Sequence, residues 1–433
     1  MIFMNLLQSK ILWIVVIFVA AASFRLTNLE LVEFKLDEAR DVLEMERFFN
    51  EPYFIQRGTI QSTGVYNPPI WYYVLNIISL PSRDAQYLSF MIALLNCGAV
   101  AGFYFVVRKY YGQTVGIFSG LLLAFSPWAI LMSRKIWAPD LIMVFLVPWL
   151  YFVHIILRNS PRRSPSATVR GVPWEWFWVV LLLSLMAQLH ASGMFLAVAA
   201  FVGLLVLRVK MNWKFALLGL MVSLITYLPY VAYQIQNSCP DCQTFVSYQS
   251  EEVGVDGNVF LRPFQLLGGS SFEIVLGSDF QLFADSYPLI RIINMFFLVV
   301  ILGMFAGVGY LIKGYKRKEY LFLLIVSGVV TLLYFITKTP AHMHYFLIVL
   351  PIMILIFSVG LSRLGGKRFW IPACAGMTVV IVNIFFMMTF YEFLSLKKDI
   401  NGDYGTIYSL SKEQAQERNM KIEEYVIYLY NNP

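Results

Sequence analysis

Long apolar segments recur along most of the chain, and they constrain its fold more than any other feature. A membrane-spanning helix needs about 20 mostly apolar residues. Segments of roughly this length lie near residues 11–31, 85–107, 115–133, 138–157, 174–190, 192–208, 214–235, 289–312, 320–337, 343–362 and 370–391. Of the 433 residues, 59% are hydrophobic and 14% are charged, a composition that excludes an ordinary soluble domain. We therefore predict an all-α polytopic membrane protein with about eleven transmembrane helices, a count that depends on the short break around His190.

Lysine and arginine residues gather in alternate connections between these segments. About half of the 33 lie near positions 10, 108–109, 158–170, 208–214, 313–318 and 363–368. Because cytoplasmic loops carry an excess of Lys and Arg, we predict a cytoplasmic N-terminus. Loops 32–84 and 236–288 and the tail 392–433 then face outward. The net charge of +7 follows from this bias, so we expect no nucleic-acid partner.

The first outward loop, residues 32–84, carries a dense acidic group. An Asp at the centre of a bilayer costs about 2.5–3.5 kcal/mol, so these acids belong at the membrane–water boundary. Residues 37–49 have the spacing of an amphipathic helix lying on the outer surface, with apolar residues on one face and Asp37, Asp41 and Glu44 on another. Asp37 also suits an N-cap. Capping alone does not account for the acids that follow it, so we favour a functional acidic site.

The same loop continues to a double proline and a run of aromatic residues. Residues 53–66 have the composition of a loop, and Pro68-Pro69 then start a short helix, because proline is tolerated in a first turn. The run Asp37-Glu38-Ala39-Arg40, followed about thirty residues later by Pro68-Pro69-Ile70-Trp71-Tyr72, resembles the bacterial GT-C membrane glycosyltransferases. That superfamily includes protein O-mannosyltransferases, aminoarabinose transferases and Rhizobium-type lipopolysaccharide sugar transferases.

Further short motifs extend the resemblance over most of residues 1–391. Ser133-Arg134 with Asp140, at the outer ends of the third and fourth apolar segments, is similar to a Ser-Arg and Asp element of the family. Gln188-Leu189-His190 and His344-Tyr345 also resemble family positions. One position departs from the pattern: many relatives carry Lys or His just before the double proline, where this chain has Asn67.

The resemblance implies a GT-C glycosyltransferase domain over residues 1–391, followed by the short extracytoplasmic tail 392–433. It implies a bacterial inner-membrane enzyme that uses a polyprenyl-phosphate-linked sugar as donor, with an active site on the outer face of the bilayer. The acceptor would be a lipid, a polysaccharide or a protein, and the transfer would invert the anomeric centre.

The chemistry of such a transfer assigns roles to particular residues. A carboxylate must accept the proton of the acceptor hydroxyl, and positive or hydrogen-bonding groups must stabilise the leaving phosphate. Asp37 is the candidate base and Glu38 its candidate assistant. Candidate substrate-binding residues are Arg134, Asp140, His190, His342, His344, Tyr345 and Asn67. A divalent ion, Mg²⁺ or Mn²⁺, would suit hard oxygen ligands here, but no ligand spacing establishes one.

Several of these assignments have a structural alternative. Arg134 and Lys135 suit interfacial anchors, Asp140 suits a helix N-terminus, and His190 suits the cap of a tight turn. For the whole chain, the alternatives to an enzyme are a transporter or flippase of lipid-linked sugars and a non-catalytic protein of envelope assembly. Transporters place polar sites near mid-membrane, whereas here the acids cluster in an outer loop.

Two further features lie in the outward segments. Cys239 and Cys242 are separated by only two residues, and we predict a local disulfide outside the cytoplasm. Residues 412–430 of the tail have the pattern of one amphipathic helix on the outer surface.

Overall fold

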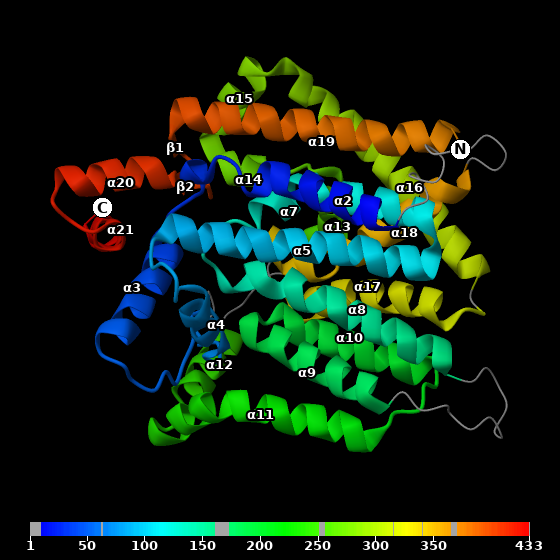
Figure 1. Ribbon diagram of the computed structural model, residues 1–433, viewed down its shortest axis with the longest axis horizontal. Helices are drawn as coiled ribbons and strands as arrows, with labels where there is room; N and C mark the ends of the chain where they lie inside the picture. Colours follow the sequence, from blue (N-terminus) through cyan, green and yellow to red (C-terminus); the bar gives the residue numbers. More distant parts are fainter. Residues whose placement is uncertain are drawn as a thin grey trace.

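The computed structural model describes residues 10–61, 64–160, 173–250, 256–314, 316–339, 341–364 and 370–432. Apolar helices run side by side across the length of the molecule and form a single bundle (Figure 1). These helices are α2 (Lys10–Arg25), α5 (Ala85–Tyr111), α6 (Gln113–Ala124), α8 (Ile142–Asn159), α9 (Pro173–Leu189), α10 (Ser192–Val206), α11 (Trp213–Gln236), α16 (Ile293–Lys313), α17 (Lys318–Ile336), α18 (Leu350–Leu364) and α19 (Trp370–Lys397).

Not every helix of the bundle has the length of a membrane span. Within the described residues, five helices are long and apolar enough to cross a membrane: Ala85–Tyr111, Ala138–Asn159, Trp213–Gln236, Lys318–Ile336 and Gly376–Lys397. Shorter apolar helices of 10–17 residues accompany them. Each predicted segment coincides with one of these long or short helices. The all-α polytopic class is thus confirmed, while the count of eleven crossings stays a prediction.

Helix ends and helix contacts follow from local sequence. Helix α5 begins after Asp84, whose carboxylate accepts the backbone N–H groups of Gln86 and Tyr87 at 2.9 and 3.1 Å. At its other end Gly112 has a φ of +101°, which lets the chain turn directly into α6. Helices α16 and α18 approach very closely, because a Cβ on Gly360 would lie 2.2 Å from a backbone oxygen of α16.

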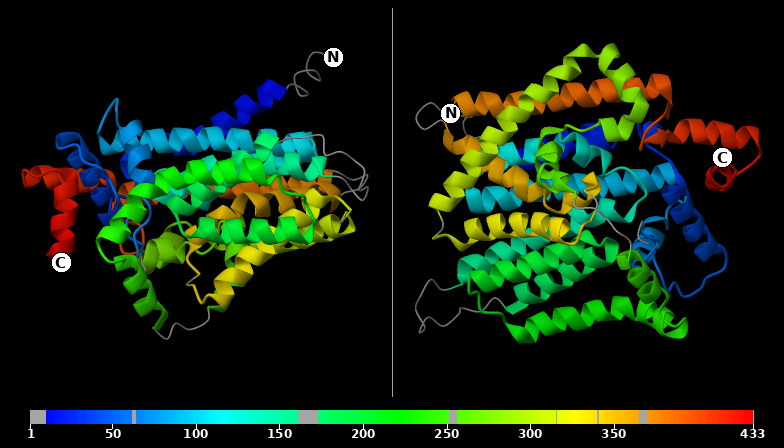
Figure 2. Two further views of the ribbon diagram at one scale, coloured as in Figure 1. Left: turned by 90° about the horizontal axis from the view of Figure 1, so that it is seen from below. Right: turned by 180° about the vertical axis from the view of Figure 1, so that it is seen from behind.

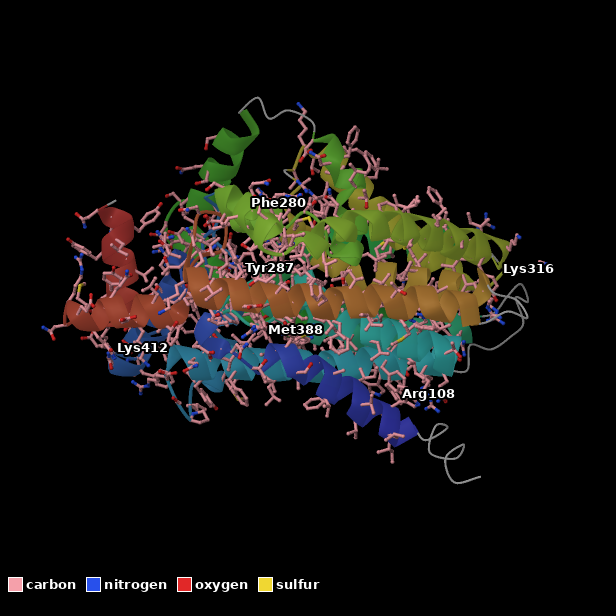
Figure 3. All side chains as sticks on the ribbon, turned by 90° about the horizontal axis from the view of Figure 1, so that it is seen from above. Arg108, Phe280, Tyr287, Lys316, Met388 and Lys412 are labelled. Atoms are coloured by element: carbon pink, nitrogen blue, oxygen red, sulfur yellow. A yellow bond between two sulfur atoms is a disulfide. The ribbon has the colours of Figure 1, made fainter. Side chains whose placement is uncertain are left out.

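The connecting elements divide between two ends of the bundle (Figure 2). The α5–α6 and α16–α17 connections lie at one end, together with Arg108 and Lys316, whereas Lys412 lies at the other (Figure 3). That second end holds α3 (Leu36–Asn50), α4 (Ile70–Ile78) and α12 (Pro240–Ser250). The predicted separation of basic connections from the acidic loop is therefore seen. Which end faces the cytoplasm stays a prediction, and residues 161–172 of one basic connection lie outside the described residues.

The two loops that we predict to face outward contain short elements. The first follows η1 (Leu29–Leu31), and its helix α3 buries Ala39, Val42 and Met45, as the amphipathic pattern predicts. The second contains α12, η3 (Gly257–Phe260), α13 (Arg262–Gly268), α14 (Glu273–Leu276), η4 (Gly277–Asp279), α15 (Phe280–Ser286) and η5 (Pro288–Ile292). Cys239 and Cys242 form the predicted disulfide. The remaining short elements are α7 (Pro127–Leu131), η2 (Ala138–Leu141) and η6 (Met343–Ile348).

The tail after α19 forms short strands and helices and binds the segment before α3. Strands β1 (Asp399–Ile400) and β2 (Gly405–Thr406) pair antiparallel, and α20 (Tyr408–Glu417) and α21 (Ile422–Asn431) follow. The single helix predicted over 412–430 is wrong, because the helix breaks between Glu417 and Ile422, at Asn419, whose φ is +53°. Asparagine adopts this left-handed conformation more readily than most residues. The backbone of the tail binds the segment before α3, with Phe34 donating to Thr406 at 3.2 Å and Tyr408 to Val32 at 2.7 Å.

Candidate active site

A cleft of about 440 Å³ opens between α3 and the loop that follows it. It is lined by Asp37, Arg40, Asp41, Leu43, Glu44, Arg47, Arg57, Gly58, Thr59, Ile60, Tyr66, Tyr72 and Trp137. The cleft has the size of a small-ligand site. The three acids that helical spacing placed on one face of α3 do share one surface, and that surface is a wall of the cleft.

The carboxylates of α3 differ in their partners. Asp41 is buried, and its Oδ2 accepts the indole N–H of Trp71 at 2.7 Å. Burial raises the pKa of Asp41 well above its ordinary value despite this hydrogen bond. Glu44 accepts the hydroxyl of Tyr53. Asp37 is exposed, and among the described residues the structure gives its carboxylate no hydrogen bond or ion pair. Asp37 is therefore the cleft carboxylate that is available to a ligand.

The structure also settles the capping alternative for Asp37. Helix α3 begins at Leu36, so its N-cap is Lys35. The carboxylate of Glu38, three positions later, accepts the backbone N–H of Lys35 at 3.0 Å. The interpretation of Asp37 as the N-cap is wrong by two residues, and Glu38 is the acid that satisfies the end of the helix.

A group of buried charges lies directly behind the cleft. Glu33 forms ion pairs with Lys135 and, at 3.6 Å, with Lys35. The Oδ2 atom of Asp140, which is buried in η2, accepts the backbone N–H of Lys135 at 3.2 Å. We call Glu33, Lys35, Glu38, Lys135 and Asp140 the buried charge cluster, although Lys35 itself is partly exposed. Sequence reasoning assigned no site role to Glu33 and Lys135, since their pairing joins segments 102 residues apart.

These charges set one another's protonation. Burial acts to raise the pKa of Glu33, but the ammonium groups of Lys135 and Lys35 outweigh it and lower that pKa. Burial likewise acts to lower the pKa of Lys135, and the carboxylates of Glu33 and Glu38 raise it instead. For Glu38, burial and the neighbouring Glu33 raise the pKa from 4.5 to about 7. The cluster therefore holds one firm ion pair and one acid that titrates near neutrality.

The predicted histidines and Tyr345 come together beside this cluster. The ring centroids of His344 and Tyr345 are 4.4 Å apart, and those of His190 lie 5.5 Å from His344 and 5.1 Å from Tyr345. His342 stacks on His344 at 5.6 Å. His344 also contacts Trp137, whose ring centroid lies 4.9 Å from that of His344. Residues from three separate segments, around positions 137, 190 and 342–345, thus meet at one place.

Trp137 joins this aromatic group to the cleft. The ammonium of Lys135 lies 4.3 Å from the centre of the Trp137 ring, and the same residue lines the cleft. His190 also fits its structural alternative, because its Nδ1 atom lies 2.9 Å from the hydroxyl of Ser192 and accepts the N–H of that residue at 3.2 Å. The cleft, the buried charge cluster and the histidines therefore form one continuous region.

The side chains of Arg134 and Asn67 contact other residues of the protein and do not line the cleft. The buried guanidinium of Arg134 donates to the carbonyl oxygens of Thr27 and Asn28 at 2.6 Å and to the hydroxyl of Tyr391. It lines a separate cavity of about 10 Å³, which is too small for a substrate. Asn67 donates to the hydroxyl of Thr59 at 2.9 Å and accepts from Gln61 at 2.7 Å. In this structure both side chains bind parts of the protein itself.

No protein-family model and no curated protein sequence matches this chain. Solved structures do. ArnT from Cupriavidus metallidurans bound to undecaprenyl phosphate superposes with a TM-score of 0.59 and 16% identity, covering 96% of this chain and 74% of ArnT. The oligosaccharyltransferase AglB from Archaeoglobus fulgidus, in complex with an inhibitory peptide and a dolichol-phosphate, has a TM-score of 0.55 and 13% identity. That match covers 97% of this chain and 59% of AglB.

A second structure of the Archaeoglobus fulgidus oligosaccharyltransferase, in complex with Zn and sulfate, has a TM-score of 0.56 and 14% identity. It covers 96% of this chain and 56% of that protein, so the chain spans less than two thirds of the archaeal enzyme. Likeness at such low identity concerns architecture, and both neighbours are GT-C glycosyltransferases. The chain is therefore a multi-pass membrane protein with the GT-C fold.

Proposed function

We propose that this protein transfers a sugar from a polyprenyl-phosphate-linked donor to a hydroxyl group of an acceptor. The observation that carries the proposal is the exposed carboxylate of Asp37, which has no partner among the described residues and lies in a cleft of about 440 Å³ at one end of an apolar helix bundle. A lipid-borne donor can reach such a place from the bilayer, and an acceptor from the water. The undecaprenyl phosphate bound to ArnT and the dolichol-phosphate bound to AglB support this class of donor.

The reaction is a single displacement at the anomeric carbon of the donor sugar. The acceptor oxygen forms a bond to that carbon while the bond from the carbon to the phosphate oxygen breaks, and its electron pair leaves with the polyprenyl phosphate. Asp37 takes the proton of the acceptor hydroxyl. Attack from the side opposite the phosphate inverts the anomeric centre. Glu38 keeps the assisting role that we predict for it by fixing the start of α3, and His190, His342, His344 and Tyr345 are proposed sugar contacts beside Trp137.

A divalent ion is not needed to write these steps. One structure of the archaeal oligosaccharyltransferase is a complex with Zn, so we asked whether residues of this chain could hold a metal ion. Within the described residues, no three His, Cys, Asp or Glu side chains are grouped so that they could hold a metal ion. Asp41 already accepts a hydrogen bond from Trp71, and Glu44 accepts one from Tyr53. These residues do not fit a protein-built metal site, and we derive no step through one.

The proposal includes the organisation of the chain in the membrane. Residues 1–391 are the transferase domain in the inner membrane of a bacterium, with the cleft and the segment 392–433 on the outer face. The nature of the acceptor, lipid, polysaccharide or protein, stays open in this proposal.

Replacing Asp37 by Asn tests the assignment of the base. The exchange keeps the size of the side chain and removes its basicity, and Asp37 does not cap α3, so the helix keeps its capping contacts. Positioned acid–base catalysis contributes about 10²–10⁴-fold, so we expect transfer to fall at least about 100-fold in a protein that is still folded and inserted. Glu51→Gln, at the other end of α3 and outside the cleft, is the matched control and should transfer normally. Near-normal transfer by purified Asp37→Asn protein, given donor and acceptor, would refute the role of Asp37.

A further inference from the structure

Three arginines line the cleft, and the structure places them differently. The guanidinium of Arg40 lies 5.7 Å from the ring centre of Tyr430, and that of Arg47 lies 5.2 Å from Tyr53. Arg57 lies between two rings, 4.4 Å from the centre of Tyr66 and 5.0 Å from that of Tyr233. Its Nη1 atom also donates to the hydroxyl of Tyr233 at 2.7 Å. Arg57 is therefore the cleft arginine that is held most closely.

The backbone around Arg57 is fixed on both sides. The N–H of Gly58 donates to the carbonyl of Asn67 at 2.6 Å, and a Cβ at Gly58 would lie 2.5 Å from a backbone oxygen of Pro68. On the other side, the side chain of Gln56 donates to Gln236 at the end of α11, at 3.3 Å. Arg57 thus stands at the joint between a tight backbone pairing and the outer end of α11.

Most donors of Arg57 remain available to a ligand. A guanidinium has five N–H groups, and the hydroxyl of Tyr233 takes one. Among the described residues, Arg57 makes no ion pair within 4.0 Å, although Asp37, Asp41 and Glu44 line the same cleft. The side chain is exposed to the cleft and its position is set by the two tyrosines. A planar fork of N–H groups matches the oxygens of a phosphate, which it can bind in a bidentate way.

We propose that Arg57 binds the phosphate of the polyprenyl-phosphate donor, with Tyr66 and Tyr233 holding the guanidinium in place. This inference rests on the proposed function. It gives the cleft a cation at a place where neither Arg134 nor Asn67 supplies a group, because both are engaged within the protein. The phosphate would then lie in the cleft that also holds Asp37, the proposed base.

The test measures binding of undecaprenyl phosphate and of undecaprenol to the full-length protein in detergent, by quenching of tryptophan fluorescence. Trp137 lines the cleft and supplies a signal there. For the wild type we expect undecaprenyl phosphate to bind more tightly than undecaprenol. Arg57→Ala should weaken the binding of undecaprenyl phosphate about 10- to 100-fold and leave the binding of undecaprenol unchanged. Arg57→Lys should recover part of the loss, because it restores the charge without the fork.

Two further variants separate binding from structure. Arg83→Ala is the matched control, because Arg83 also lies over a ring, at 4.2 Å from Phe49, but does not line the cleft. It should bind both lipids normally. Tyr233→Phe keeps the ring and removes the hydroxyl that accepts from Arg57, and we expect a smaller loss than for Arg57→Ala.

The outcomes distinguish this inference from the proposal on which it rests. A wild type that binds undecaprenyl phosphate no better than undecaprenol would overturn the proposed function. If the wild type prefers undecaprenyl phosphate to undecaprenol and the Arg57→Ala variant keeps the same preference, only the role of Arg57 is overturned. Displacement of undecaprenyl phosphate by an equal concentration of inorganic phosphate would overturn the assignment of the site to a lipid-borne phosphate.

Discussion

The cleft and the buried charge cluster lie on either side of α3. Both contain acidic and basic side chains, but these have different roles in the two regions. In the cleft, Asp37 and Arg57 are exposed and make no ion pair with described residues. Behind it, Glu33 and Lys135 are buried and paired with each other. An exposed charge can exchange water for a ligand, whereas a buried charge without its partner is strongly unfavourable. Substitutions should therefore damage ligand binding and chemistry in the cleft, and folding in the cluster.

The largest effect on stability is expected for Lys135→Met. The substitution keeps much of the chain length but leaves the carboxylate of Glu33 buried without Lys135, its closest cation. Breaking a buried pair in this way costs about 3–5 kcal/mol. We expect a correspondingly lower unfolding free energy in denaturant titrations of the detergent-solubilised protein.

A double variant sharpens this test. Glu33→Gln combined with Lys135→Met removes both charges and should recover a large part of the lost stability, because no buried charge is then unpaired. If the single variant is as stable as the wild type, the ion pair has no structural role and the contrast between the two regions fails.

The next effect concerns Arg134, which the sequence resemblance places with the substrate. Its hydrogen bonds go to the carbonyl oxygens of Thr27 and Asn28 and to Tyr391, so the structure favours a role in joining the segment after α2 to α19. Hydrogen bonds to a charged group contribute about 1.5–3 kcal/mol. Arg134→Ala should lower the unfolding free energy by about this amount, and the variant that still folds should bind undecaprenyl phosphate like the wild type. Weaker donor binding at unchanged stability would support a phosphate contact instead.

The effect that is smallest per pH unit is a pH dependence that originates in Glu38. Its pKa is raised from 4.5 to about 7, so between these values the folded protein holds a proton that the unfolded chain has lost. Stability from this group is therefore fully present below pH 4.5 and falls as pH rises through 7, by at most about 1.4 kcal/mol per pH unit. Glu38→Gln should flatten the pH profile of the unfolding free energy within this window. An unchanged slope in the variant would show that Glu38 does not titrate there.

Local patterns carried the predictions that the structure confirms. The apolar segments, the two faces of α3 and the disulfide between Cys239 and Cys242 each depend on residues that are close in the sequence. The central ion pair of the buried charge cluster and the contacts of Arg134 do not, because Lys135 meets Glu33 across 102 residues and Arg134 meets Tyr391 across 257. A single sequence shows that a charge is present beside a membrane segment, but its partner is decided by how the helices pack. For the same reason the sequence indicates only a loop around Arg57 and predicts no role for its side chain.

The contact between the tail and the first loop has a consequence for biogenesis. Residues 31–34 receive hydrogen bonds from, or donate them to, residues 404–408, which are synthesised roughly 370 residues later. Domains generally fold from the N-terminus as the chain emerges. Here the acidic helix follows a segment that must wait for nearly the whole chain to be translated and inserted. Until then the nascent protein would expose an unfinished first loop, and a prematurely terminated chain would lack the contacts that hold the segment before α3.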